Sequence, residues 1–306
     1  MNIREKIELL QILSGYTQQE IATRLNVTVV ALNRWFNEKA QPRPVASRAL
    51  DQLLSEYGVR IDQSDPLSVK KNLLHAKQKK HPKILQKILK RRDLYDSFLL
   101  ALTYHSNSIE GSTMTERDTA AVLFDRATLS NKTLVEQMEA KNHAAAMDYL
   151  FAHLAKKGTI DEALILKLHS ILMNAIYADA GLYRRHGVRI VGSRTVTANY
   201  MKVPDKMKGL CGQLKKAQNK SVIEHVTRIH ALFEAIHPFS DGNGRVGRLL
   251  MAAMFLESDF PPAIISQKKK QIYYGALEKA QVSEFYAPLE DVVCNALIDG
   301  YTLIED

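Results

Sequence analysis

The twelve residues HPFSDGNGRVGR, from His237 to Arg248, dominate the interpretation of this 306-residue chain. Gly and Asn adopt positive φ readily and Asp can bond its own backbone, so residues 241–244 are predicted to form a tight turn. Apolar residues recur every three or four positions before this segment, from 222 to 236, and again after it, from 246 to 256. The segment therefore predicts a helix, a glycine turn and a second helix.

The same segment collects groups that bind anions. Backbone N–H groups at a glycine turn, the N-terminus of the following helix and the side chains of Arg245 and Arg248 all favour a phosphate. His237 precedes the turn, where a general base could act on a bound substrate. A charged surface turn without a ligand is the alternative, and it accounts less well for this mixture of residues.

Every specified position of the segment matches the motif His-Pro-Phe-x-Asp-Gly-Asn-Gly-Arg-x-x-Arg, so the chain resembles the Fic (Fido) family. Members of that family transfer AMP from ATP to protein hydroxyl groups. The resemblance implies a mainly α fold, namely a Fic-type helical bundle with one β-hairpin flap. It assigns the catalytic base to His237 and Mg²⁺ binding to Asp241. Within the motif it assigns ATP binding to Asp241, Gly242, Asn243, Gly244, Arg245 and Arg248.

Composition describes an ordinary soluble globular protein, with 46% hydrophobic and 25% charged residues. No apolar run approaches the roughly 20 residues that span a bilayer, and the N-terminus lacks the pattern of a signal peptide. The two cysteines, Cys211 and Cys294, are too few for a disulfide framework or a cysteine metal site. We therefore expect a cytoplasmic protein that does not associate with a membrane.

Residues 1–58 are predicted to form a small helix-turn-helix domain. Thr17 and Glu20 have the spacing of a capping box at the start of one helix, and Thr28 can cap the next. Two short helices separated by a three- to four-residue turn define the helix-turn-helix plan. Residues 17–44 resemble the helix-turn-helix of the phage-repressor-like (XRE-type) family, which implies that Thr28, Asn33 and Arg34 face DNA. The alternative is a protein-interaction domain of the same shape that does not bind DNA.

Residues 59–92 are predicted to form a basic linker helix. Between residues 66 and 92 there are ten basic residues and no acidic one, so the net charge of +9 is concentrated in this segment. Pro82 interrupts its apolar stripe. The segment either lies along DNA phosphates beside the helix-turn-helix or is a solvated basic face.

The rest of the chain, residues 93–306, is predicted to be the Fic domain. SNSIEG, residues 106–111, resembles the inhibitory motif Ser/Thr-x-x-x-Glu-Gly/Asn that precedes the core in some members of the family. The matching positions are Ser106, Glu110 and Gly111. The resemblance implies that Glu110 pairs with Arg248 and keeps the γ-phosphate of ATP from that arginine.

Alternation at Val188, Ile190 and Val196, interrupted at Gly192, predicts a β-hairpin over residues 187–204. This stretch resembles the flap of the family, which holds a target segment over the active site by strand pairing. The resemblance places the backbone of four flap residues beside the nucleotide: Arg189, Ile190, Val191 and Gly192.

Two further interpretations concern aromatic residues and histidines. By resemblance, Tyr273, Tyr274 and Gln281 line the adenine and ribose side of the pocket, whereas the tyrosines taken alone would be packing residues. The histidines at 143, 153 and 169 are interpreted as hydrogen-bonded packing residues. Those at 225, 230 and 237 lie five and seven residues apart, which is not the spacing of a helical zinc pair.

The predicted function is therefore transfer of AMP from Mg-ATP to a Tyr, Thr or Ser hydroxyl of a protein, with Glu110 as the inhibitor. The target protein is not identified by the sequence, and both modification of this chain itself and a homodimer are left open. Three alternatives remain: a nucleotide-responsive transcription regulator, removal of AMP from a modified protein at the same site, and transfer of another group such as phosphocholine or UMP.

Overall fold

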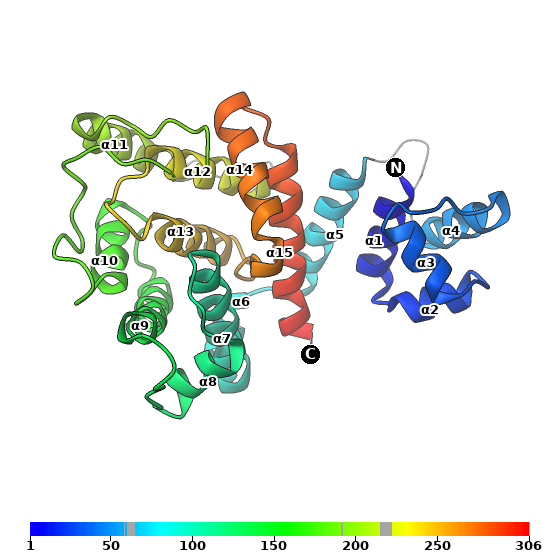
Figure 1. Ribbon diagram of the computed structural model, residues 1–306, viewed down its shortest axis with the longest axis horizontal. Helices are drawn as coiled ribbons and strands as arrows, with labels where there is room; N and C mark the ends of the chain where they lie inside the picture. Colours follow the sequence, from blue (N-terminus) through cyan, green and yellow to red (C-terminus); the bar gives the residue numbers. More distant parts are fainter. Residues whose placement is uncertain (58, 60–64, 191, 215–221, 306) are drawn as a thin grey trace. The chain divides into compact units, whose positions relative to one another are not determined.

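The computed structural model describes residues 1–57, 59, 65–190, 192–214 and 222–305, and the regular structure in these ranges is helical (Figure 1). The chain divides into two compact units, Met1–Lys77 and Gln78–Asp306. The predicted linker segment is divided between them and is not one helix. It forms α5 (Pro66–Lys80) and α6 (Ile84–Lys90), separated around Pro82, because proline cannot donate the hydrogen bond that would continue α5.

The first unit confirms the predicted helix-turn-helix. It contains α1 (Ile3–Ser14), α2 (Gln18–Arg24), α3 (Val29–Phe36) and α4 (Pro44–Glu56). The capping box at α2 is complete, because the Thr17 hydroxyl accepts from the Glu20 N–H and the Glu20 carboxylate accepts from the Thr17 N–H. Thr28 caps α3 in the same manner by accepting from Ala31 N at 3.2 Å. Apolar residues of all four helices form one core, which orients α2 and α3.

The second unit is a helical bundle around α13 (Asn243–Glu257). The other helices are α6, α7 (Arg92–Ile109), α8 (Glu116–Phe124), α9 (Leu134–Ala155), α10 (Glu162–Leu172), α11 (Val203–Leu214), α12 (Val222–Ile236), α14 (Lys270–Ser283) and α15 (Ala287–Glu305), with short 3₁₀ turns η1 (Tyr200–Lys202) and η2 (Gln267–Lys269). Helices α7, α9, α10 and α12 all pack against α13, and Figure 1 shows α13 in the middle of this unit. Because α13 is buried on every side from Val246 to Leu256, it is the core element of the bundle.

The predicted β-hairpin is wrong: residues 185–190 and 192–199 form an irregular loop, and the described part of the chain contains no strand. Side chains take the place of a backbone ladder. The Thr197 hydroxyl donates to the Val188 carbonyl at 2.8 Å, and the buried Arg184 side chain donates to the carbonyls of His186 and Ala198. Two strands alone are marginally stable, so these side-chain bonds decide the path of the loop.

Candidate active site

A cavity of about 790 Å³ opens between α7, α12, α13, α14 and the loop that follows α10. It brings together most of the residues predicted for the site: Glu110, Arg189, Ile190, Gly192, His237, Asp241, Asn243, Gly244, Arg248, Tyr273, Tyr274 and Gln281. Gly242, Arg245, Ser106 and Gly111 are not among the cavity-lining residues. Val191 lies outside the described residues.

The glycine turn is shorter than predicted, because α13 begins at Asn243 and not at Val246. Gly242 has φ +76° and caps the helix, a backbone conformation that L side chains rarely adopt. The Asn243 side chain accepts from Phe239 N and donates to Phe239 O, both at 2.9 Å, which fixes the segment before the turn. The N–H groups of the first helical turn have no intrahelical partner, so the wall of the cavity at Gly244 favours an anion.

His237 follows α12 and has φ 52°, in the left-handed region. Its Nδ1 lies 3.2 Å from the Glu234 carbonyl oxygen, so Nδ1 carries the hydrogen and Nε2 is left as the basic nitrogen. Burial lowers the pKa of His237, which keeps the imidazole neutral at pH 7. The buried Arg184 donates from Nε to the His237 carbonyl at 2.7 Å and holds this strained residue in place.

Arg248 makes the contact that the sequence predicts with Glu110. Its Nη2 donates to Glu110 Oε1 at 2.7 Å, its Nε donates to Ser106 Oγ at 2.9 Å, and Nη2 also lies 3.0 Å from the Ser106 carbonyl. Burial lowers the pKa of Arg248, but the charge of Glu110, its hydrogen bond and the charges of Tyr273 and Glu234 together outweigh burial, so the pKa is raised and the arginine is charged. Among the described residues, Nη1 of Arg248 has no hydrogen-bond partner.

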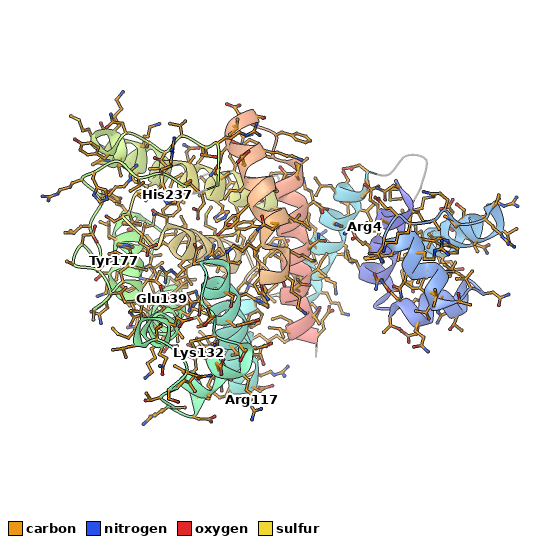
Figure 2. The ribbon with its side chains drawn as sticks, in the orientation of Figure 1. Arg4, Arg117, Lys132, Glu139, Tyr177 and His237 are labelled. Carbon is orange, nitrogen blue, oxygen red and sulfur yellow. The ribbon has the colours of Figure 1, made fainter. Side chains whose placement is uncertain are left out.

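Arg245, in contrast, does not face the cavity. Its side chain is 3% exposed, with Nη1 2.6 Å from Glu139 Oε1 of α9 and Nη2 3.5 Å from Asp241 Oδ2. Figure 2 labels Glu139 in the same part of the second unit as His237 and Tyr177. The sequence predicted that Arg245 binds a phosphate, and in the structure its guanidinium is bonded to Glu139 and lies near Asp241.

Asp241 is the one predicted metal ligand, and its carboxylate suits Mg²⁺. Its side chain is 46% exposed, and Oδ1 accepts from Gly242 N at 2.6 Å. The described residues contain no group of three or more His, Cys, Asp or Glu side chains that could hold a metal ion. Mg²⁺ commonly binds through one or two carboxylates, waters and substrate phosphates, so a single carboxylate beside a phosphate site fits this ion.

The three residues predicted to line the adenine and ribose side of the pocket already make hydrogen bonds within the protein. Tyr274 lines the cavity and donates from its hydroxyl to the Ile109 carbonyl at 3.3 Å, whereas Tyr273 is buried with its hydroxyl 2.7 Å from His230 Nε2. The amide of Gln281 already donates to Ala231 O at 3.2 Å and accepts from Thr195 Oγ1 at 2.8 Å. Gln281 therefore ties the loop to the bundle.

The histidines interpreted as packing residues do make such contacts. His143 Nδ1 lies 3.0 Å from Thr103 Oγ1, His169 stacks on Phe239 at 3.7 Å between ring centroids, and His153 Nε2 lies 2.9 Å from the Thr159 carbonyl oxygen. Burial lowers the pKa of His143 to about 3 and that of His169 to about 4, so both are neutral.

Three acidic residues of the site were missed by sequence reasoning. Glu234 is buried in the cavity wall with Oε2 3.9 Å from His237 Nδ1, and burial raises its pKa to about 8 although Arg248 acts in the opposite direction. Glu278 accepts from the Arg194 N–H of the loop at 3.0 Å. Glu139 holds Arg245. Only Glu234 had a signal in the sequence, since it lies three residues before His237, in the last turn of the helix that leads to it.

In the first unit, the residues predicted to contact DNA lie along α3. Thr28 and Arg34 are exposed, and Asn33 is half-buried. Val30, on the same helix, is 70% exposed. The surface of α3 is therefore accessible, while its buried residues pack into the core of the unit.

Comparison with known proteins agrees with this geometry. Residues 159–255 match the Fic/DOC family, and residues 7–62 match a helix-turn-helix family. Protein adenylyltransferase Fic from Drosophila erecta is 32% identical over 187 residues, which are 58% of this chain and 36% of that relative. The relative from Drosophila virilis is 33% identical over 58% of this chain and 37% of its own length. This chain therefore spans little more than a third of the curated relatives it matches.

Solved structures show the same fold. A Fic-domain-containing signaling protein from Bacteroides thetaiotaomicron has a TM-score of 0.67 at 24% identity, over 76% of this chain and 94% of that chain. A fragment of Fic-1 from C. elegans has a TM-score of 0.61 at 21% identity, over 96% of this chain and 97% of that chain. The molecule is a helical Fic-fold protein. In particular, its residues 159–255 match the Fic/DOC family and the preceding residues 7–62 match a helix-turn-helix family, in the order that the sequence predicted.

In the described part of the chain, no helix combines the length and the apolar character that crossing a membrane requires.

Proposed function

We propose that this protein is a protein adenylyltransferase, which transfers AMP from ATP to a Tyr, Thr or Ser hydroxyl of a protein and is inhibited by its own Glu110. The strongest support is that one cavity is lined by neutral His237, by the N-terminus of α13 and by Arg248. The carboxylate of Glu110, which ATP could displace, is paired with that arginine. The curated relatives that carry the name protein adenylyltransferase Fic support the same reaction.

In this proposal the phosphates of ATP lie over the first turn of α13, where backbone N–H groups are free to donate. Arg248 binds the γ-phosphate. His237 Nε2 takes the proton of the incoming hydroxyl while that oxygen forms a bond to the α-phosphorus, and the bond between the α-phosphorus and the bridging oxygen breaks. Pyrophosphate leaves with both electrons of that bond. Mg²⁺, held by Asp241, would supply positive charge to the phosphate oxygens.

Glu110 inhibits by occupying the phosphate site. Its carboxylate pairs with Arg248 at 2.7 Å, and a Cβ atom added to Gly244 would clash with Glu110 Oε1, so the carboxylate lies directly over the start of α13. An anion already sits where a phosphate would bind. ATP must displace Glu110 before Arg248 can take the γ-phosphate.

The loop over residues 185–199 would present the target segment. Glu278 and Gln281 of α14 hold its turn through Arg194 and Thr195, while Val196 is 90% exposed at its surface. Carbonyl and N–H groups that lack a ladder partner can bind an extended peptide of varied sequence.

Mass spectrometry of a lysate incubated with Mg-ATP tests the reaction. The Glu110→Gly protein should add the mass of AMP to a hydroxyl residue of a target or of itself, and wild-type protein should add much less. The matched control is the Glu110→Gly, His237→Ala double variant, which should bind ATP but transfer nothing. Equal transfer with and without His237 would refute the assignment. A different added mass, or loss of AMP from a modified protein, would select one of the alternative reactions.

A second proposed function is DNA binding through α3, because Thr28 and Arg34 are exposed on the helix that would enter the major groove. Selection from random duplexes tests it. The His237→Ala protein should recover a preferred sequence as well as wild type does. Recovery of no preferred sequence would favour a protein-interaction domain.

A further inference from the structure

The two arginines of the HPFSDGNGRVGR segment have different partners, although the motif treats them alike. Arg248 contacts Glu110 of α7, whereas Arg245 contacts Glu139 of α9 and approaches Asp241. The distances differ: Nη1 of Arg245 is 2.6 Å from Glu139 Oε1, but Nη2 is 3.5 Å from Asp241 Oδ2. The guanidinium is therefore bonded to Glu139 and only near Asp241.

This difference matters because Asp241 is the proposed cation ligand. A cation competes with any positive side chain for the same carboxylate oxygens. Arg245 is 3% exposed and cannot turn to solvent, so its charge must be balanced by a neighbouring acid. Glu139 supplies that acid. Without it, the buried guanidinium would have Asp241 as its remaining carboxylate within 4 Å among the described residues.

We propose that Glu139 is a positioning residue of the cation site: by bonding Arg245 it keeps the Asp241 carboxylate available for the divalent cation that accompanies the nucleotide. The inference rests on the proposed function, because it takes Asp241 as the cation ligand.

A purely structural link between α9 and α13 predicts different behaviour. Such a link would lower the stability of the bundle and weaken nucleotide binding whether or not a cation is present. A positioning role predicts a defect confined to the cation. Outer-shell partners of metal ligands change metal affinity by about 10- to 100-fold when they are replaced.

The test is calorimetric titration of ATP into full-length protein carrying Glu110→Gly and His237→Ala, so that the site is open and no transfer occurs. Glu139→Gln is added to this background and compared with Glu139→Asp and with Lys141→Gln, a change at an exposed position on the same helix. Each protein is titrated in EDTA and over a series of Mg²⁺ concentrations, and thermal denaturation checks that it is folded.

For Glu139→Gln we expect the ATP affinity in EDTA to match that of the parent within about twofold. Mg²⁺ should increase the ATP affinity of both proteins, but the Mg²⁺ concentration that gives half of this increase should be about tenfold higher for Glu139→Gln. Glu139→Asp should recover part of the loss, and Lys141→Gln should match the parent. An unchanged Mg²⁺ requirement, or an equal loss in EDTA and in Mg²⁺, overturns the inference alone. A background protein that binds no ATP under either condition overturns the proposed function and this inference with it.

Discussion

Replacing Glu110 by glutamine should have two effects: tighter ATP binding and lower stability of the protein without nucleotide. The pair between Glu110 and Arg248 is short, at 2.7 Å, and its arginine side chain is 8% exposed while the carboxylate is 31% exposed. Hydrogen bonds between charged partners contribute about 1.5–3 kcal/mol, and exposure of the carboxylate reduces this to about 1–1.5 kcal/mol. Because ATP must separate Glu110 from Arg248 in order to bind, removing the negative charge of Glu110 should raise the affinity of the protein for ATP about five- to tenfold.

Losing the stabilisation of the Glu110–Arg248 pair should also lower the melting temperature of the protein without nucleotide by about 2–6 °C, because 1 kcal/mol corresponds to about 2–4 °C in a domain of this size. Titration calorimetry with Mg-ATP in a His237→Ala background measures the affinity, and thermal denaturation measures the stability. Glu116→Gln is the control, because it removes the same charge from an exposed position on α8. An ATP affinity for Glu110→Gln within twofold of the parent would refute competition between Glu110 and the γ-phosphate.

Three further predictions concern pH, the turn and DNA. The pKa of Glu234 is raised to about 8 from 4.5, so the folded protein binds the extra proton and the free energy of unfolding should fall as pH rises from about 5 to 8. Glu234→Gln should abolish this decrease in stability with pH. Thermal denaturation from pH 5 to 9 tests it, and melting temperatures that change with pH in the same way in both proteins would contradict it. Gly242→Ala should cost about 1 kcal/mol or more, because φ is +76° and the new Cβ would lie 2.5 Å from Met173 Cε; urea unfolding measures this loss, and unchanged stability would contradict it. Arg34→Ala should weaken DNA binding and reduce its salt dependence, as fluorescence anisotropy would report, and an unchanged affinity would remove Arg34 from the interface.

Much of the fold was predictable from short-range chemistry. The capping box of Thr17 with Glu20 and the Thr28 cap appear as expected, because a cap depends on residues three positions apart. The contact between Glu110 and Arg248 was also anticipated, but only through resemblance to a family. Glu110 by itself is an ordinary acid before a glycine, and nothing in its neighbours indicates a partner 138 residues away.

The predicted hairpin shows where pattern reasoning fails. Val188 and Val196 alternate with polar neighbours as strand residues do, yet Val196 is 90% exposed and the two arms share no ladder among the described residues. Alternation indicates a strand only when one face is buried against a sheet or helix. Here Arg184, Glu278 and Gln281 hold the loop, and the last two lie 84 and 86 residues away from their partners in it.

The caps of α2 and α3 and the positive φ of Gly242 could be read from the chain, because each depends on φ preferences and hydrogen bonds within about four residues. The roles of the two arginines could not. Arg245 and Arg248 lie three residues apart, and their carboxylate partners lie 106 and 138 residues away. Packing of α7 and α9 against α13 brings those carboxylates to buried guanidinium groups, whose charge must be balanced where they lie. The assembled bundle therefore decides which arginine is available to a phosphate.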